Sequence, residues 1–302
     1  MVTHAAAVAG YHVLSFDTEV YARTLALGAT TPFTEEADAA IRSMQDVRSE
    51  AALGDGLMAI EYSPSGPQQR MFWTEENAAH IDAARRLIPE YSKACQPFLL
   101  ASLLVSADAV ANTTGVYGAY LKLFKPAALK PMVISPLHTR PNPAPAGSGL
   151  LDGDDAKSAL AMLASVPKPH GMTVVYADPP YNQRQYSANY APLKLLTEYT
   201  AGGVRAETKT GLAVDPFKSP FCRPKDVRSA FEGLVTAAQM CADHLLVSYS
   251  SDGLLSQSEL GELLGDRAHC QIIEHRRYRS VKGPTPAGSP TKVSELLYVV
   301  KF

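Results

Sequence analysis

Residues 176–190, "YADPPYNQRQYSANY", place an acid, two adjacent prolines and four tyrosines in one short stretch. The run 173–177 that leads into it is strand-like and predicts a strand of a sheet. Asp178 and Tyr181 would then emerge where this strand ends, on backbone that the two prolines make rigid. An ordinary turn needs none of these features, so the stretch indicates a functional loop.

Length and composition indicate a globular protein of one large domain or two smaller ones. The chain has 302 residues, of which 46% are hydrophobic and 19% charged. No apolar run reaches the roughly 18 residues that cross a bilayer, and the first residues lack the basic flank of a secretory signal. We therefore expect a cytoplasmic protein with no membrane partner.

The cysteines and the distribution of charge narrow the class of protein further. The four cysteines are scattered, with no Cys-x-x-Cys and no histidine at metal-ligand spacing, so we expect free thiols and no metal. The formal net charge is -2, but residues 117–140 carry four basic residues and no acid. Residues 268–302 carry six basic residues against two acids. These segments favour phosphate binding, and plain solvated surface is the competing interpretation.

The order of apolar patterns predicts an α/β fold. The run 11–16 reads as a strand that ends at Asp17, followed by a helix over 19–27. Thr74 predicts the start of a second helix, and the apolar residues 98–111 predict a buried helix. The proline-rich residues 127–149 predict a loop.

The second half of the chain alternates helices and strands more regularly. We expect a helix over 226–242, a strand over 244–250, a helix opened by a capping box of Ser256 and Glu259, and a long hairpin from 270–278 and 296–301. Such alternation predicts a mostly parallel sheet with an antiparallel edge strand. Ligands of these sheets gather at the carboxyl ends of the strands, where Asp17, Asp178 and Ser250 would lie.

The sequence Asp178-Pro179-Pro180-Tyr181 resembles the catalytic motif of the methyltransferases that modify amino groups of DNA bases. Its continuation "NQRQYSANY" is similar to the adenine-specific DNA methylases of the restriction-modification and Dam-like group. Further segments resemble that family in the same order, namely "RMFWTEENAAHIDAAR", "ANTTGVYGAYLK", "KTGLAVDPFKSPFCRP", "LLVSYSSDGLLSQSEL" and "RRYRSVKG" followed by "VSELLYVVK".

The resemblance implies a Rossmann-like class I methyltransferase fold that uses S-adenosylmethionine, with a C-terminal antiparallel hairpin and a mostly helical insert. Residues 1–30 and 147–302 would form the catalytic domain, and residues 31–146 the insert that recognises the target. The implied reaction is methyl transfer to the exocyclic N6 of adenine in double-stranded DNA, with a cognate restriction endonuclease as a candidate partner.

The resemblance also assigns roles to residues of the motif. The Asp178 carboxylate and the Pro179 carbonyl would accept hydrogen bonds from the adenine amino group, with Pro180 fixing the backbone and Tyr181 stacking on the flipped base. Asp17 would hold the ribose of S-adenosylmethionine. Asp155 would meet the adenine of this donor, with Asp154 as a near rival.

DNA contacts are expected from the insert, from the loop after the motif and from the hairpin. Ser248, Tyr249 or Ser250 would line the target pocket. The candidate contacts are Tyr117, Tyr120, Lys122, Lys125, Arg184, Tyr186, Asn189, Tyr190, Arg277 and Arg279. For the tyrosines after the motif, packing on one another is an equally weighted interpretation.

One expected element is absent from the sequence. The family carries a strand ending in Phe-x-Gly-x-Gly that approaches the methyl donor, and no such stretch precedes Asp17. We therefore expect the first central strand to be missing, through a shortened gene model or through degradation, and we favour the former. The chain of 302 residues is then expected to bind S-adenosylmethionine weakly or not at all.

Other functions remain open at this point. A catalytically impaired DNA-binding remnant and an RNA adenine methyltransferase are the main alternatives. Methylation of cytosine is disfavoured because Ser usually replaces Asp178 there. An oxidoreductase is remote because nothing resembles Gly-x-Gly-x-x-Gly.

Overall fold

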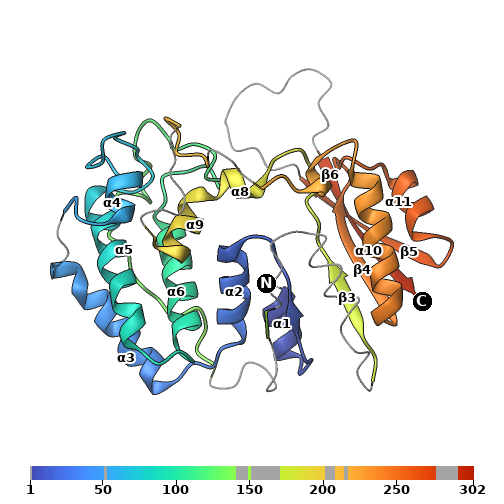
Figure 1. Cartoon of the computed structure of the whole chain (residues 1–302), viewed down its shortest axis with the longest axis horizontal. Coiled ribbons are helices and arrows are strands. Elements are labelled where there is room, and N and C mark those ends of the chain that lie inside the picture. Colours follow the sequence, from blue (N-terminus) through green and yellow to red (C-terminus); the bar gives the residue numbers. More distant parts are fainter. Residues whose placement is uncertain are drawn as a thin grey trace. The chain divides into compact units, whose positions relative to one another are not determined.

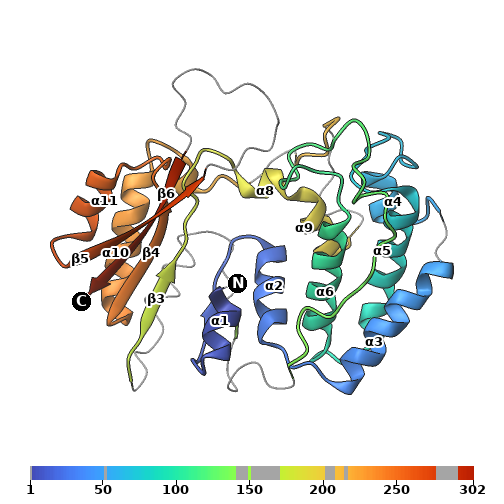
Figure 2. The same cartoon turned by 180° about the vertical axis from the view of Figure 1, so that it is seen from behind.

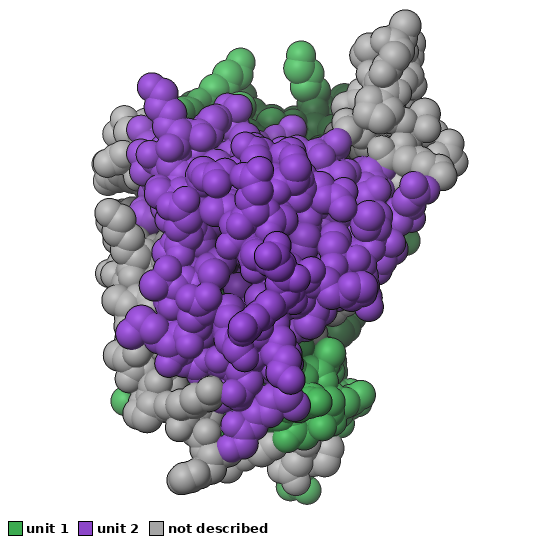
Figure 3. Space-filling view, turned by 90° about the vertical axis from the view of Figure 1, so that its right-hand side faces the viewer, with its two compact units in different colours: residues 1–152, 186–216 green, residues 153–185, 217–302 purple. Residues whose placement is uncertain are grey.

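The structure is a computed structural model, and it describes residues 2–50, 53–140, 149–150, 171–200, 208–213, 217–276 and 292–302. The chain forms two compact units (Figure 3), unit 1 from residues 1–152 and 186–216 and unit 2 from residues 153–185 and 217–302. Each unit has its own hydrophobic core.

Unit 1 is mainly helical. Its two short strands, β1 (Leu14–Ser15) and β2 (Gly149–Leu150), pair in parallel. Its helices are α1 (Val2–Val8), α2 (Val20–Thr30), α3 (Glu35–Asp46), α4 (Leu57–Tyr62), α5 (Glu75–Leu87), α6 (Gln96–Ala109), α8 (Tyr186–Asn189) and α9 (Ala191–Glu198). One-turn 3₁₀ helices cover Val47–Glu50 and Ile88–Glu90.

Helix α6 forms the centre of unit 1 (Figure 1), with α5 on one side and α2 on the other. Its side chains are apolar nearly all round, and Phe98, Leu99, Leu103 and Leu104 are fully buried. A helix in the middle of a helical layer has little surface in contact with water, which explains this pattern. The prediction of a buried helix here is confirmed.

Helix α5 begins with a local signal that the sequence carries, and near its other end it supports α9. The Thr74 hydroxyl accepts a hydrogen bond from the Asn77 amide at 3.2 Å, which caps the first turn. Near the other end, the Arg85 guanidinium donates to the carbonyls of Leu196 and Thr197 at 3.0 and 2.9 Å. These are last-turn carbonyls of α9, so Arg85 supplies partners that the α9 backbone lacks.

Unit 2 contains a four-stranded mixed sheet. Its strands are β3 (Val174–Ala177), β4 (His244–Ser250), β5 (Ala268–Arg276) and β6 (Lys292–Lys301), in the order β3-β4-β6-β5. Its helices are α10 (Val227–Cys241) and α11 (Gln257–Leu264), with a 3₁₀ turn at Pro220–Cys222. The predicted strand at 244–250, capping box and terminal hairpin are confirmed.

The prediction of a mostly parallel sheet is wrong for the described residues. Only β3 and β4 run parallel in unit 2, since β6 pairs antiparallel with both β4 and β5. The hairpin therefore contributes two strands and two of the three pairings. The other parallel pair, β1 with β2, is a separate two-stranded sheet.

The two faces of the β3-β4-β6 region differ in chemistry. Leu245, Val247 and Tyr249 alternate along β4 and are fully buried, and Leu296, Tyr298 and Val300 do the same along β6. They share one core with α10 and α11, which lie on the same side of the sheet (Figures 1 and 2). The residues that lie between these buried ones along β4 and β6 face away from the two helices.

The first predicted strand is shorter than expected. The run 11–16 forms a strand at Leu14–Ser15, which pairs with β2. Tyr11 and Leu14 remain 62% and 41% exposed. Helix α2, which follows, packs on α6, so residues 1–30 lie in the same compact unit as most of the predicted insert. The assignment of residues 1–30 to the catalytic domain and of residues 31–146 to target recognition stays a prediction.

None of the helices in the described part of the chain combines the length and the apolar character that a bilayer span needs.

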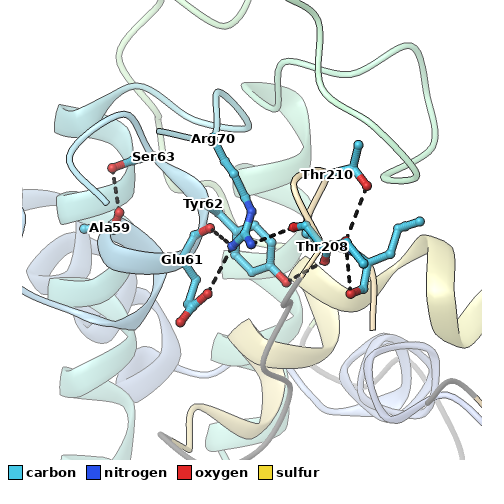
Figure 4. A network of polar contacts seen from close by, with 9 residues as sticks. Ala59, Glu61, Tyr62, Ser63, Arg70, Thr208 and Thr210 are labelled. Carbon is cyan, nitrogen blue, oxygen red and sulfur yellow. Dashed lines mark hydrogen bonds and ion pairs between the residues drawn. The ribbon is translucent and has the colours of Figure 1, made fainter. Parts of the chain in front are cut away.

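Within unit 1, a buried arginine holds a segment that is distant in sequence against α4. The Arg70 side chain is 1% exposed, and its guanidinium donates to the Glu61 carbonyl at 2.7 Å, to the Glu61 carboxylate at 3.1 Å and to the Thr208 carbonyl at 2.8 Å (Figure 4). It also lies over the Tyr62 ring, whose hydroxyl donates to the Gly211 carbonyl. The segment 208–213 is thereby fixed to α4.

We expect Arg70→Met to destabilise the protein by about 3 kcal/mol, because it leaves two carbonyls and a carboxylate without their buried donor. Urea denaturation measures the change. The matched control is Arg42→Met, since Arg42 is 65% exposed and pairs with Asp38 on the surface of α3. The control should change stability by less than about 0.5 kcal/mol. Equal effects of both substitutions would contradict the anchoring role.

Candidate active site

The pairing of β3 with β4 positions Asp178. The last register pair joins Ala177 to Val247, so Asp178 emerges at the carboxyl end of β3, beside Ser248. The next residue, Pro179, is buried and has no amide hydrogen to continue the ladder. Residues 178–181 therefore form a rigid exit from the sheet, as the sequence predicts.

Tyr181 is held in place by both its backbone and its ring. Its carbonyl accepts a hydrogen bond from the Leu254 amide at 2.9 Å, which ties the motif to the loop after β4. Its ring meets the buried ring of Tyr249 edge on, with centroids 6.3 Å apart. The residue as a whole keeps partial exposure to solvent, so Tyr181 is packed against Tyr249 and still accessible to a ligand.

Asp178 lies on the sheet face that turns away from α10 and α11. This face also carries Tyr176, Ser248 and Glu295, which alternate with the buried core residues of their strands. Burial raises the pKa of Asp178, and the negative charge of Glu295 raises it further. More than a third of the Asp178 surface remains accessible, so water screens part of this repulsion.

The loop after the motif is fixed by the segment 217–222. The Ser219 amide donates to the Gln185 side chain at 2.9 Å, and the Cys222 thiol donates to the Arg184 carbonyl at 3.3 Å. The Arg184 amide donates to the Asn182 side chain at 2.9 Å. The backbone of Arg184 is thus held while the residue stays exposed to solvent.

Four tyrosines of unit 1 form a contiguous cluster. Tyr190 lies 5.3 Å from Tyr21, 6.0 Å from Tyr117 and 5.7 Å from Tyr186, on which it stacks, as measured between ring centroids. Tyr186 is exposed at the edge of this cluster. The predicted contacts Tyr117, Tyr186 and Tyr190 therefore lie together, and mutual packing of the tyrosines, the alternative interpretation, is also present.

Tyr117 is a core residue within this cluster. It is 1% exposed and stacks on Phe72, and its hydroxyl donates to the Asp108 carboxylate at 2.8 Å. Burial and Asp108 raise the pKa of the Tyr117 hydroxyl well above its ordinary value. In this conformation its ring offers a nucleic acid almost no surface.

The predicted contact Asn189 lies close to Gly118, the residue after Tyr117. A Cβ added at Gly118 would lie 3.1 Å from the Asn189 side-chain oxygen.

The predicted lysine contacts lie on a loop organised by Asn112. The Asn112 side chain donates to the carbonyls of Met71 and Leu121 and accepts from the Lys125 amide. The Lys125 ammonium donates to the Thr113 carbonyl at 2.9 Å. Lys122 is exposed. Of the two cations, Lys122 is thus more available to a phosphate.

Asp17 follows β1 and is exposed, as expected for a ligand-binding carboxylate. One of its oxygens accepts the Glu19 amide at 2.8 Å, just before α2 begins. A carboxylate has about four acceptor positions, so this bond is compatible with ligand contacts. The cofactor-binding role of Asp17 stays a prediction. Asp155 and its rival Asp154, and Arg277 and Arg279, lie outside the described residues.

Glu19 is a buried acid beside Asp17 that was not among the predicted site residues. Its side chain is only 5% exposed, and burial, followed by the charge of Asp17, raises its pKa to about 7 despite the opposing charges of Lys194 and Arg23. The sequence signal for Glu19 was an acid two residues after Asp17, at the start of an apolar helix. No group of three or more metal-liganding side chains gathers within the described ranges.

A mixed sheet with a rigid acid at the end of a parallel strand, together with a helical unit, is compatible with a methyltransferase. The Type II methyltransferase M.CviAII of Paramecium bursaria Chlorella virus 1 is 36% identical over 288 residues, 93% of this chain and 82% of that protein. The Type II methyltransferase M.NlaIII of Neisseria lactamica is 32% identical over 82% of this chain and 72% of its own length. The chain belongs to the Type II methyltransferase family.

A further match agrees. The Type II methyltransferase M.FokI of Planomicrobium okeanokoites is 33% identical over 74% of this chain, which corresponds to 33% of that longer protein. No model of a protein family matches the chain, and no solved structure does.

We expect Glu19→Gln to stabilise the protein at pH 8 more than at pH 5. The folded state raises the Glu19 pKa from 4.5 to about 7, so it holds an extra proton between these values and loses stability as pH rises. The glutamine does not ionise, and the gain between the two pH values should be about 2 kcal/mol. Thermal denaturation at both values measures it.

The control for this substitution is Glu90→Gln, which removes an exposed carboxylate of the same unit. Its effect should not depend on pH. A pH-independent effect of Glu19→Gln would show that the buried carboxyl is not the cause.

Proposed function

We propose that this chain transfers a methyl group from S-adenosylmethionine to the exocyclic N6 of adenine in DNA, as the modification enzyme of a restriction-modification system. The observation that carries the proposal is Asp178-Pro179-Pro180-Tyr181 at the carboxyl end of β3, fixed by β4 and by the loop after it. Membership of the Type II methyltransferase family supports methyl transfer.

The residue types suit the chemistry of an amino group on a purine. The lone pair of N6 is delocalised into the ring, so the nitrogen is a poor nucleophile. Two acceptors, the Asp178 carboxylate and the Pro179 carbonyl, would bind the two N–H groups and favour a tetrahedral nitrogen. The prolines hold the carbonyl in place beforehand, and such preorganised groups contribute about two to three powers of ten in rate.

When bound, S-adenosylmethionine would supply an electrophilic methyl group, with its thioether as the leaving group. N6 forms the new bond with its lone pair and becomes positively charged. Asp178 then accepts one N–H proton, while the N–H electron pair stays on N6. The raised pKa of Asp178 supports this role, since a more basic carboxylate is a better proton acceptor.

A base inside a duplex cannot reach such a pocket and must flip out of the stack, at a cost of a few kcal/mol. The ring of the partly exposed Tyr181, packed edge on against Tyr249, would stack on the extruded adenine and offset part of that cost. Ser248 and Ser250, at the end of β4, would line the same pocket.

Other residues receive roles that follow the family resemblance. Asp17 and Asp155 would hold S-adenosylmethionine. Tyr117 would support the DNA surface from the core, since its ring is buried. The proposed DNA contacts are Lys122, Lys125, Arg184, Tyr186, Asn189, Tyr190, Arg277 and Arg279. A cognate restriction endonuclease would act on the same DNA site.

We expect Asp178→Asn to lower the rate of methyl transfer by at least about a hundredfold, because the amide is a weaker acceptor and takes no proton. Transfer of labelled methyl from S-adenosylmethionine to duplex DNA measures the rate, with the donor at millimolar concentration so that weak binding does not limit it. An unchanged rate would contradict the role of Asp178.

Variants of Tyr181 provide a matched pair. Tyr181→Phe keeps the aromatic face and should retain most of the rate, whereas Tyr181→Ala should lose at least about tenfold, mainly through weaker binding of the target base.

The same assay separates the alternative functions. Transfer to RNA in preference to DNA would favour the RNA methyltransferase. DNA binding without any transfer would favour an impaired remnant and contradict the proposal.

A further inference from the structure

Glu295 occupies an unusual position for an acid. It lies on β6, an interior strand of the sheet, directly opposite Ser250 of β4. Its neighbour Leu296 is buried in the core of unit 2, while Glu295 itself turns to the opposite face. That face is the one on which Asp178 leaves β3.

The contacts of Glu295 hold it without neutralising it. The Ser248 hydroxyl donates to its carboxylate at 2.8 Å, and Ser248 lies beside Asp178 in the register of β3 and β4. Among the ion pairs between described residues, none involves Glu295. A neutral donor thus fixes one acid close to another, an arrangement that costs electrostatic energy and is characteristic of functional sites.

We propose that Glu295 is a positioning residue whose fixed negative charge, held by Ser248, keeps Asp178 a strong acceptor for the proton that leaves the target amino group. This inference rests on the proposed function of Asp178. It extends the reacting motif on β3 by a residue that lies more than a hundred positions later in the chain.

The charges around Asp178 agree with this role. After burial, Glu295 is the cause that raises the pKa of Asp178. Among the side chains described at this end of the sheet, the other titratable groups are the hydroxyls of Tyr176 and Tyr181 and the carboxylates of Asp252, in the loop after β4, and Glu274, on β5. None of these four contributes to the shift of the Asp178 pKa.

A purely structural role for Glu295 makes a different prediction. The hydrogen bond from Ser248 needs only an acceptor, and the side-chain oxygen of glutamine is one. If packing and this bond were all that mattered, Glu295→Gln would behave like the wild-type protein. If the charge matters, the same substitution must change how the reaction depends on pH.

The experiment is the pH profile of the single-turnover rate of methyl transfer to duplex DNA, for the wild-type protein, Glu295→Gln, Glu295→Ala and Glu295→Asp. In the wild type the rate should fall on the acid side as Asp178 becomes protonated. Both variants without charge should shift this fall to lower pH and lower the rate at pH 8 by roughly threefold, because Asp178 becomes less basic. Glu295→Asp should retain more of the wild-type profile.

The midpoint of the acid limb does not depend on the concentration of folded protein, so a variant that folds incompletely still gives a result. Glu262→Gln, which removes an exposed carboxylate of α11 that pairs with Arg228, controls for net charge and should leave the midpoint unchanged. An unmoved midpoint in Glu295→Gln and Glu295→Ala would overturn the inference. A wild-type rate in Asp178→Asn would instead refute the proposed function itself.

Discussion

The parallel pairing of β3 with β4 is the constraint on which the proposed chemistry depends. Four register pairs, from Val174 with His244 to Ala177 with Val247, fix where β3 ends and therefore where Asp178 emerges. Since side chains alternate along a strand, a slip of one residue would turn Asp178 toward α10 and α11. The prolines after Asp178 then stop the ladder and direct the backbone away from the sheet.

The same alternation explains how one sheet serves both stability and reaction. Val175 and Ala177 contact the core of unit 2, while Tyr176 and Asp178 belong to the opposite face. On β4 and β6, apolar residues alternate with Ser248 and Glu295 in the same way. The core residues hold the strands in register, and the register holds three polar groups at one end of β3. Stability and chemistry therefore share a backbone without sharing side chains.

Local signals in the sequence predicted much of this structure. The caps at Thr74 and Ser256 act within a few residues of the chain, and helix α10 and strand β4 follow their apolar periods closely. The errors concern contacts between distant segments. Nothing local shows that β6 inserts between β4 and β5, that Tyr117 is buried against Phe72, or that a helical unit buries Glu19. In the sequence, Glu295 is one of two acids in a basic segment, and nothing there relates it to Asp178. Only the register of β6 brings the two acids near each other.

The central claim is that Asp178 and the backbone of Pro179 act on the amino group of an extruded adenine. Mass spectrometry of nucleosides from duplex DNA treated with the protein and S-adenosylmethionine tests it most directly. The account predicts N6-methyladenine in the wild-type sample and its loss in the Asp178→Asn sample. Methylated cytosine in place of methylated adenine, or N6-methyladenine formed equally by both proteins, would contradict it.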